Sequence, residues 1–301
     1  MYGLAIGDAL GYPVEFLREY RFKATYKEKG LTDFLHTPAL YSDDTQMSIA
    51  IAKALISSAD AEKLDDIDYV MEKVTNEFID WFLSPDHRGP GRACLKGCNH
   101  LNEGESWETS GDLDAKGCGS AMRTAPIGLV YHDDIKKLKE IAIATAKPTH
   151  QHPAALAGAV GTAYLVALGL NKTKPELVAD NLLELTDSMS DIFTQRILQV
   201  KKSLNFEPEE AFKVIGAGWV AEEAVAGALY CFLRSPDNYS QSVLTAVNFS
   251  GDRDSVACIT GAISGAYNGI NAIPEKWIKK VENSDLLNEL ADKLYNIKSI
   301  R

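Results

Sequence analysis

The 301-residue sequence predicts an all-α fold. Apolar residues recur at three- and four-residue spacing along most of the chain, which is the pattern of helices that bury one face. Runs of alternating apolar and polar residues are not found, and neither are Asn-Gly or Asp-Gly turns with strands on both sides. Thr, Val and Tyr are also not gathered into runs. A compact globule of many helices, without a sheet, is therefore expected.

The first helix is expected within residues 3–16, which read GLAIGDALGYPVEF. Glycines at positions 3, 7 and 11 form a seam of small residues, and Pro13 ends the helix because proline cannot continue its hydrogen bonding. Glu15 follows at the helix exit. A carboxylate there suits a general base or a substrate ligand, and a solvated loop glutamate is the alternative.

The remaining helices follow in order and share an apolar face at helical spacing. They are predicted at residues 43–58, 66–83, 134–146, 153–168, 175–186, 190–203, 208–213, 219–234, 239–248, 253–270 and 285–297. Two of them, 153–168 and 256–269 within 253–270, are dense in Ala and Gly, which lets helix axes approach closely and predicts central positions. The unusual loops 84–93, 102–120 and 147–153 are expected to carry function.

Composition narrows the class of protein. Hydrophobic residues make up 46% of the chain, enough for a large core, and no linker divides it, so residues 1–301 are expected to form a single domain. The net charge of −11 makes nucleic acid an unlikely partner, although a local basic pocket for a phosphorylated small molecule is compatible with it. Five scattered cysteines predict buried thiols rather than disulfides or a zinc site. No secretory signal or membrane segment is recognised, so a cytoplasmic protein without membrane contact is expected.

Two short acidic clusters carry most of the functional information. They are Ser42-Asp43-Asp44-Thr45 and Gly251-Asp252-Arg253-Asp254-Ser255, and each stands where a helix begins. Carboxylates and hydroxyls are the ligands that Mg²⁺ and Mn²⁺ prefer. The plainer interpretation is that Ser42 and Asp252 are helix caps, with acidic residues favoured beside them by the helix dipole.

Six motifs in a fixed order favour the interpretation of these clusters as metal ligands over their interpretation as helix caps alone. They are GDALGYPVEF, SDDTQM, GCGSAMR, THQHP, GWVAEEA and SGDRDSVACITGAISGAYNG, which run from about residue 3 to about residue 277. With these motifs the chain resembles the ADP-ribosylglycohydrolases, in the branch that contains dinitrogenase reductase-activating glycohydrolase and the ADP-ribosylarginine hydrolases.

The resemblance implies a compact, orthogonal multi-helix fold with a binuclear metal cleft that holds two Mg²⁺ (or Mn²⁺) ions. The implied metal ligands are Ser42, Asp43, Asp44, Asp252, Asp254 and Ser255. The implied catalytic residues are Glu15, Asp44 and Asp254. The implied substrate-binding residues are Gly89, Gly91, Gly117, Gly119, Ser120, Met122 and His150, with the 117–120 turn facing the diphosphate and His150 facing phosphate or ribose. A helix-capping role for His150 is the alternative.

Three positions depart from the family pattern. Ser255 stands where the family usually has Thr, and it keeps the hydroxyl ligand. Arg253 replaces a small polar residue, and its side chain is expected either to point to solvent or to reach toward the substrate. Cys118 stands where most members have Asn or a similar residue, so its side chain is not expected to be essential. Trp107, in the long loop, is expected either to stack on a base or to pack.

The implied reaction is metal-dependent hydrolysis of the N-glycosidic (or O-glycosidic) bond between ADP-ribose and an acceptor. Protein arginine is the expected acceptor, so an ADP-ribosylated protein would be the substrate and ADP-ribose the product. Serine-linked or nucleic-acid-linked ADP-ribose is an alternative substrate. A different class of function is an immunity-type protein that binds an ADP-ribosyltransferase toxin and blocks it.

Overall fold

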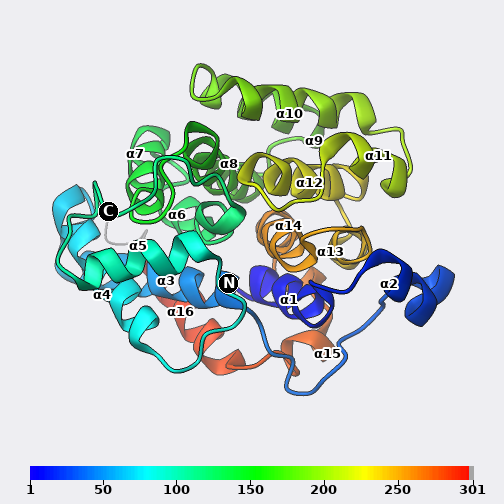
Figure 1. Cartoon of the computed structure of the whole chain (residues 1–301), viewed down its shortest axis with the longest axis horizontal. Coiled ribbons are helices and arrows are strands. Elements are labelled where there is room, and N and C mark those ends of the chain that lie inside the picture. The colour runs from blue at the N-terminus through cyan, green and yellow to red at the C-terminus, as the bar shows by residue number, and fades with distance from the viewer. Residues whose placement is uncertain (298–301) are drawn as a thin grey trace.

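The computed structural model describes residues 1–297. Over that range it contains sixteen α-helices, four short 3₁₀ turns and three isolated β-bridges, with no strand (Figure 1). The predicted all-α class is confirmed. The first eight helices are α1 (Tyr2–Gly11), α2 (Glu19–Tyr26), α3 (Asp43–Asp60), α4 (Ile67–Leu83), α5 (Arg92–Asn102), α6 (Ala125–Val130), α7 (Ile135–Ala146) and α8 (Pro153–Leu170). The other eight are α9 (Pro175–Thr186), α10 (Asp191–Ser203), α11 (Pro208–Ile215), α12 (Ala221–Arg234), α13 (Tyr239–Val247), α14 (Arg253–Asn268), α15 (Glu275–Ile278) and α16 (Ser284–Ile297).

Four helices escaped prediction from the sequence. α6 and α15 are six and four residues long, too short to show a helical period. α2 buries only Phe22 among its eight residues, so it has no apolar face to recognise. The start of α5 lies within the segment expected to be a loop, because the residues RGPG precede it directly.

The glycine seam of α1 determines how the centre of the protein is built. α1 packs along α14, and the two helices lie side by side in the middle of the molecule (Figure 1). A Cβ added to Gly3 would lie 2.2 Å from the carbonyl oxygen of Gly261, and one added to Gly7 would lie 2.0 Å from that of Ala257. Only glycine permits this approach, so the seam predicted from the sequence is a helix–helix contact.

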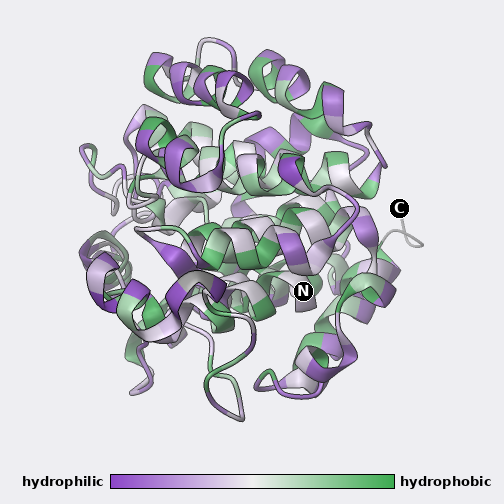
Figure 2. Ribbon diagram, turned by 90° about the vertical axis from the view of Figure 1, so that its right-hand side faces the viewer, coloured by the Kyte–Doolittle hydropathy of each residue, from purple (hydrophilic) through white to green (hydrophobic). Residues whose placement is uncertain are grey.

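The helices rich in Ala and Gly are central, as predicted. Apolar residues concentrate on the inner helices and hydrophilic residues on the outer faces (Figure 2). α8 is 18 residues long and apolar enough in composition to cross a membrane, but 78% of that segment is buried within the fold. Its burial identifies it as a core helix.

The five cysteines are all free thiols, as predicted. Cys94, Cys98, Cys231 and Cys258 are buried, whereas Cys118 is only half-buried. The prediction of burial was therefore wrong for Cys118, because the turn that carries it borders a cavity.

Candidate active site

The first acidic cluster forms the start of α3. The Ser42 hydroxyl accepts a hydrogen bond from the Asp44 N–H at 3.2 Å, so Ser42 is the predicted N-cap. The carboxylate of Asp8, from α1, accepts hydrogen bonds from the Ser42 N–H at 2.8 Å and from the Thr45 N–H and hydroxyl at 3.0 and 2.6 Å. Asp8 therefore fixes the helix end that presents Asp43 and Asp44.

The second acidic cluster forms the start of α14 in the same way. The Asp252 carboxylate accepts a hydrogen bond from the Ser255 N–H at 3.3 Å, which makes Asp252 the predicted N-cap. Asp254 follows in the first turn, and its carboxylate accepts from the same N–H at 3.0 Å. Capping and an acidic cleft are thus compatible, because both helix ends open into one cavity of about 730 Å³.

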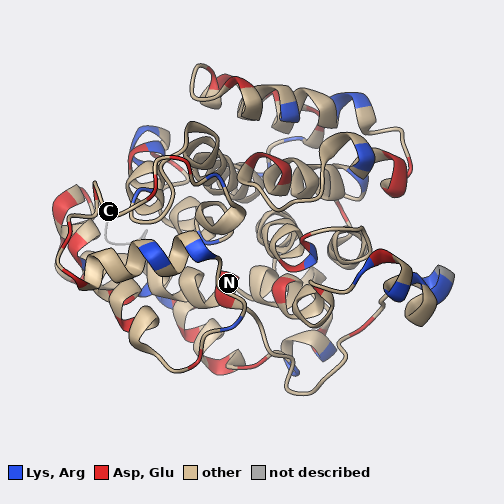
Figure 3. Ribbon diagram, viewed as in Figure 1, with Lys and Arg blue, Asp and Glu red and all other residues tan. Residues whose placement is uncertain are grey.

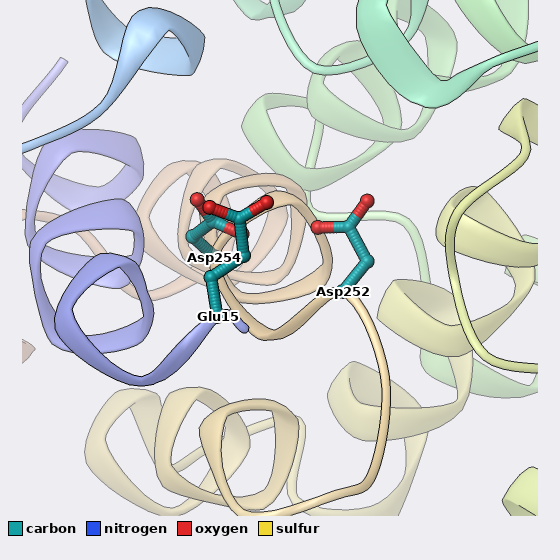
Figure 4. Close-up of side chains that lie close together, drawn as sticks. All are labelled: Glu15, Asp252 and Asp254. Atoms are coloured by element: carbon teal, nitrogen blue, oxygen red, sulfur yellow. The ribbon is translucent and has the colours of Figure 1, made fainter. Parts of the chain in front are cut away.

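Glu15 joins the second cluster from the exit of α1. Carboxylate oxygens of Glu15, Asp252 and Asp254 all lie within 4.8 Å of one another, and Figure 4 shows the three carboxylates gathered at the start of α14. A Cβ added to Gly89 would lie 3.5 Å from Glu15 Oε2 and 3.9 Å from Asp43 Oδ1, so Glu15 also lies near the first cluster. The two clusters and the helix exit therefore converge, as predicted.

The close packing of these buried carboxylates favours the binding of a cation. Burial raises the pKa of Asp43, Asp44, Asp252 and Asp254 above the usual range, and the charges of neighbouring carboxylates add to this at Asp43, Asp44 and Asp252. The pKa of Glu15 is raised to about 10, mainly by burial and then by the charges of Asp254, Asp252 and Asp43. None of these five carboxylates forms a salt bridge within the described part of the chain.

The donor set fits a hard divalent cation. All five side chains offer oxygen, and Asp44 Oδ2 is buried without a hydrogen-bond partner. A buried carboxylate oxygen without a partner is costly unless a cation or proton meets it. The carboxylates around Asp44 are therefore suited to hold metal ions of the Mg²⁺ or Mn²⁺ type.

Another part of the cavity wall is built by the glycine-rich turn 117–120 and by His150, and Cys118 of this turn donates a hydrogen bond to Asp252 Oδ2 at 3.1 Å. A Cβ added to Gly119 would lie 2.8 Å from His150 Cε1, so glycine is required for the turn to reach the histidine. Nδ1 of His150 and the Thr149 hydroxyl are 2.8 Å apart, and burial lowers the pKa of His150 to about 3, which keeps it neutral. The cap of the following helix is His152, which accepts from the Ala154 N–H, so the alternative role for His150 was wrong.

Two basic side chains, Arg92 and Lys96, line the same cavity from the first two turns of α5. Figure 3 shows this helix carrying Lys and Arg, while acidic residues mark α1 and the start of α14. Lys96 pairs with Asp112 at 3.0 Å, and Arg92 is exposed. The cavity is thus lined by both acidic and basic side chains, which suits a sugar bearing a diphosphate.

Most of the residues proposed from the sequence line this cavity. They are Glu15, Asp43, Asp44, Gly89, Gly91, Gly117, Gly119, Met122, His150, Asp252, Asp254 and Ser255. Two others, Ser42 and Ser120, are fully buried and do not line it. The hydroxyl of Ser120 donates to the carbonyl oxygen of Ala155 at 3.0 Å, so its observed role is to fix the turn to α8.

Both expectations for Arg253 were wrong, because its side chain is buried and does not line the cavity. Its guanidinium donates to the carbonyl oxygens of Val14 and Leu17 at 3.4 and 3.1 Å, and to the Glu19 carboxylate at 3.2 Å. It also lies 4.3 Å from the centre of the Phe22 ring. Arg253 therefore ties the segment that carries Glu15 to the helix that carries Asp252 and Asp254.

An aromatic pair at the cavity was not predicted. The rings of Phe16 and Trp219 are stacked, with centroids 6.0 Å apart and planes 15° from parallel, and both line the cavity. Trp107 does not line it and instead lies near Lys147. The sequence signal that could have identified the pair is position, since Phe16 follows Glu15 and Trp219 lies in the GWVAEEA motif.

Comparison with known proteins agrees with this site. Residues 1–299 match the model of the ADP-ribosylglycohydrolase family. An uncharacterized protein of Archaeoglobus fulgidus is 32% identical, covering 98% of this chain and 94% of its own. ADP-ribosylarginine hydrolase Tri1 of Serratia proteamaculans is 25% identical (97% and 77% covered), and ADP-ribosyl-[dinitrogen reductase] glycohydrolase of Rhodospirillum rubrum is 26% identical (93% and 88% covered).

The fold agrees as well. A solved structure titled as an ADP-ribosylglycohydrolase-related protein complex matches with a TM-score of 0.78 and 25% identity, covering 98% of this chain and 95% of that one. The chain therefore belongs to the ADP-ribosylglycohydrolase family and is an ADP-ribosyl-acceptor glycohydrolase.

Proposed function

We propose that the protein releases ADP-ribose from arginine residues of proteins and that it uses two Mg²⁺ or Mn²⁺ ions. The observation that supports this best is the convergence of five buried carboxylates, among them Asp44 with its unpartnered Oδ2, in one cavity that Arg92 and Lys96 also line. The proposed ligands are Asp43 and Asp44 on α3 and Asp252, Asp254 and Ser255 on α14. Ser42, whose hydroxyl oxygen caps α3 and keeps a second lone pair, is retained as a further ligand candidate.

Divalent cations bound there would orient the ribose hydroxyls and lower the pKa of water. The diphosphate would lie toward Arg92, Lys96 and the 117–120 turn, where cationic side chains and backbone N–H groups favour phosphate oxygens. The neutral ring of His150 would contact phosphate or ribose by hydrogen bonding rather than by charge. The scissile bond would then lie beside Glu15.

In the proposed reaction, a water molecule attacks C1″ and Glu15 accepts a proton from it. The bond between C1″ and the guanidine nitrogen breaks, the electron pair stays on nitrogen, and the nitrogen takes up a proton. Positive charge develops on the sugar in the transition state, so the surrounding carboxylates stabilise it. The high pKa of Glu15 in the metal-free protein would fall when positive charge is bound nearby.

Arginine is favoured as the acceptor by the residue that follows Glu15. Phe16 is 72% exposed at the cavity and stacks on Trp219. A guanidinium is planar and cationic, and it is stabilised by an aromatic face and a nearby carboxylate. The names of two relatives, an ADP-ribosylarginine hydrolase and a dinitrogen reductase glycohydrolase, support the same class of substrate.

The test is release of ADP-ribose from a protein carrying the label on arginine, on serine, or on a nucleic acid, with Mg²⁺, Mn²⁺ or a chelator. We expect release from arginine only, and only with metal. Asp43→Ala and Asp254→Ala should abolish it while the variants stay folded. Undiminished release by either variant would contradict the metal assignment, and faster release from serine would contradict the acceptor.

A further inference from the structure

A second cavity, of about 570 Å³, adjoins the active-site cavity. The two share Phe16 and Gly89 in their lining. The second cavity is otherwise lined by side chains from the exit of α1 and from the segment before α3, among them Tyr12, Pro13, His36, Pro38 and Leu40. Apart from His36, none of its described lining residues is ionisable near neutral pH. The cavity is therefore mainly apolar.

Gly89 is the point at which the two cavities meet. A Cβ added to it would lie 3.5 Å from Glu15 Oε2, 3.7 Å from Tyr12 Cε2 and 3.9 Å from Asp43 Oδ1. Its φ of +77° also favours glycine. The backbone therefore passes close to both clusters of carboxylates without a side chain, and the second cavity begins within a few ångströms of the acidic centre.

The groups proposed to bind phosphate belong to the active-site cavity alone. Arg92, Lys96 and the 117–120 turn line the active-site cavity, and none of them lines the second one. If the diphosphate binds to these groups and C1″ lies at the acidic cluster, then the acceptor attached to C1″ faces Glu15 and Phe16, which line the same cavity. The chain that carries the acceptor must leave past these residues.

The surface there is unusually apolar for an exposed region. Phe16 is 72% exposed and Leu40 is 43% exposed, and Pro13, His36 and Pro38 are exposed as well. Exposed apolar side chains that gather around a groove mark a site of protein contact. Because the groove is continuous with the active-site cavity, its occupant is expected to be joined to the substrate.

We propose that the second cavity is a subsite for the acceptor polypeptide. It would hold an uncharged, apolar stretch that flanks the ADP-ribosylated residue, while the modified side chain itself enters the acidic cavity. This proposal rests on the proposed function only in that the acceptor is a protein. It does not depend on which residue of that protein carries the label.

The test compares two substrates that differ only in the polypeptide. One is ADP-ribosylarginine as the free small molecule, and the other is a protein ADP-ribosylated on arginine. Leu40→Glu places a charge on the rim of the second cavity, and we expect it to lower kcat/KM for the protein substrate by about tenfold, equivalent to about 1.4 kcal/mol. The kcat/KM for the small molecule should stay within about twofold, because Leu40 does not line the active-site cavity.

A matched control is Leu177→Glu, since Leu177 is 49% exposed on α9 and lines neither cavity. It should change neither value. His36→Glu charges the same rim from another position and should repeat the effect of Leu40→Glu, which covers the case in which one variant folds poorly. Equal losses for both substrates, or no loss for the protein, would overturn the proposal.

The outcome also separates this proposal from the preceding one. If the wild-type enzyme releases ADP-ribose from serine and not from arginine, the assignment of arginine fails. The same comparison is then made with ADP-ribosylserine and a protein labelled on serine. A selective loss for the protein would still support the acceptor subsite.

Discussion

Gly11 at the end of α1 packs directly against the backbone of Asp254 at the start of α14. A Cβ added to Gly11 would lie 2.4 Å from the Cα atom of Asp254 and 2.5 Å from its nitrogen. Glu15 follows four residues after Gly11, and its carboxylate reaches the same aspartate. The close contact between α1 and α14 therefore places the carboxylate of Glu15 beside Asp254.

Gly11→Ala should reduce kcat by more than the accompanying loss of stability explains. The added methyl cannot fit, so α1 must move away from α14, at a cost of about 1–3 kcal/mol. Gly3→Ala is the matched control, because its Cβ would lie 2.2 Å from the carbonyl oxygen of Gly261, at the far end of the same seam. Both variants should lower Tm, and kcat should fall further in Gly11→Ala. Equal kcat values at a temperature where both are folded would refute the link.

Asp44→Asn should make the metal-free protein more stable and weaken metal binding. The substitution removes a buried charge that burial and the neighbouring carboxylates disfavour, as the raised pKa of Asp44 indicates. It also removes a proposed ligand, so affinity for Mn²⁺ should fall by about tenfold or more. Calorimetry measures the affinity, and thermal melting in chelator measures the stability. Asp68→Asn, at an exposed first-turn position of α4, should change neither.

Stabilisation by metal should increase with pH. The pKa values of Asp43, Asp44, Asp252 and Asp254 are raised in the folded, metal-free protein. Stability from their protonated forms is fully present below the unfolded pKa of 3.8 and is lost as pH rises through the folded values. The pKa of the buried Asp8 is raised to about 7 by burial and by the Asp254 charge, so its own contribution is lost as pH rises through that value.

Metal ions bind the deprotonated carboxylates, so they compete with protons at low pH. The Tm increase caused by Mg²⁺ or Mn²⁺ should therefore grow as pH rises from 5 to 8, because fewer protons then compete with the metal for these carboxylates. Melting curves with metal and with chelator across this range provide the measurement. A Tm increase that stays constant with pH would show that these carboxylates are not the ligands.

Much of the site could be predicted because its signals are local. Ser42 and Asp252 can be recognised as helix caps from about four consecutive residues. The glycines at 3, 7 and 11 predict a close contact with another helix, but they do not show which helix it is. The six ordered motifs then supplied the grouping of Glu15 with the two clusters. The cavity lining confirms that these residues meet, while their roles as ligands remain predictions.

What escaped prediction depends on tertiary packing. In the sequence, Asp8 is a single charged residue in an apolar helix with no evident role. In the structure its carboxylate accepts hydrogen bonds from the backbone N–H groups of Ser42 and Thr45, far along the chain. Trp219 lines the cavity and stacks there on Phe16, a residue far away in the sequence. Arg253 was misassigned because its neighbours Asp252 and Asp254 face the cavity, whereas successive residues of a helix point in different directions.

Arg253 offers the sharpest test of how Glu15 is held. Its guanidinium binds two carbonyl oxygens that flank Glu15, those of Val14 and Leu17, and also the Glu19 carboxylate. Arg253→Met keeps the buried volume but loses these bonds, so the segment that carries Glu15 should loosen. A misplaced catalytic group costs up to about a hundredfold in rate, so kcat should fall by about ten- to a hundredfold with a smaller change in KM.

Because Arg253 would act through Glu15, the two substitutions should not be additive. In a Glu15→Gln background, Arg253→Met should lower kcat by less than about twofold further, as expected for residues that act as a unit. Hydrogen exchange of residues 12–19 should quicken in Arg253→Met and not in Arg234→Met, which loses comparable bonds to Leu204 and Glu207 on the far side of α12. Losses in kcat that multiply, together with unchanged exchange, would mean that Arg253 stabilises the fold without positioning Glu15.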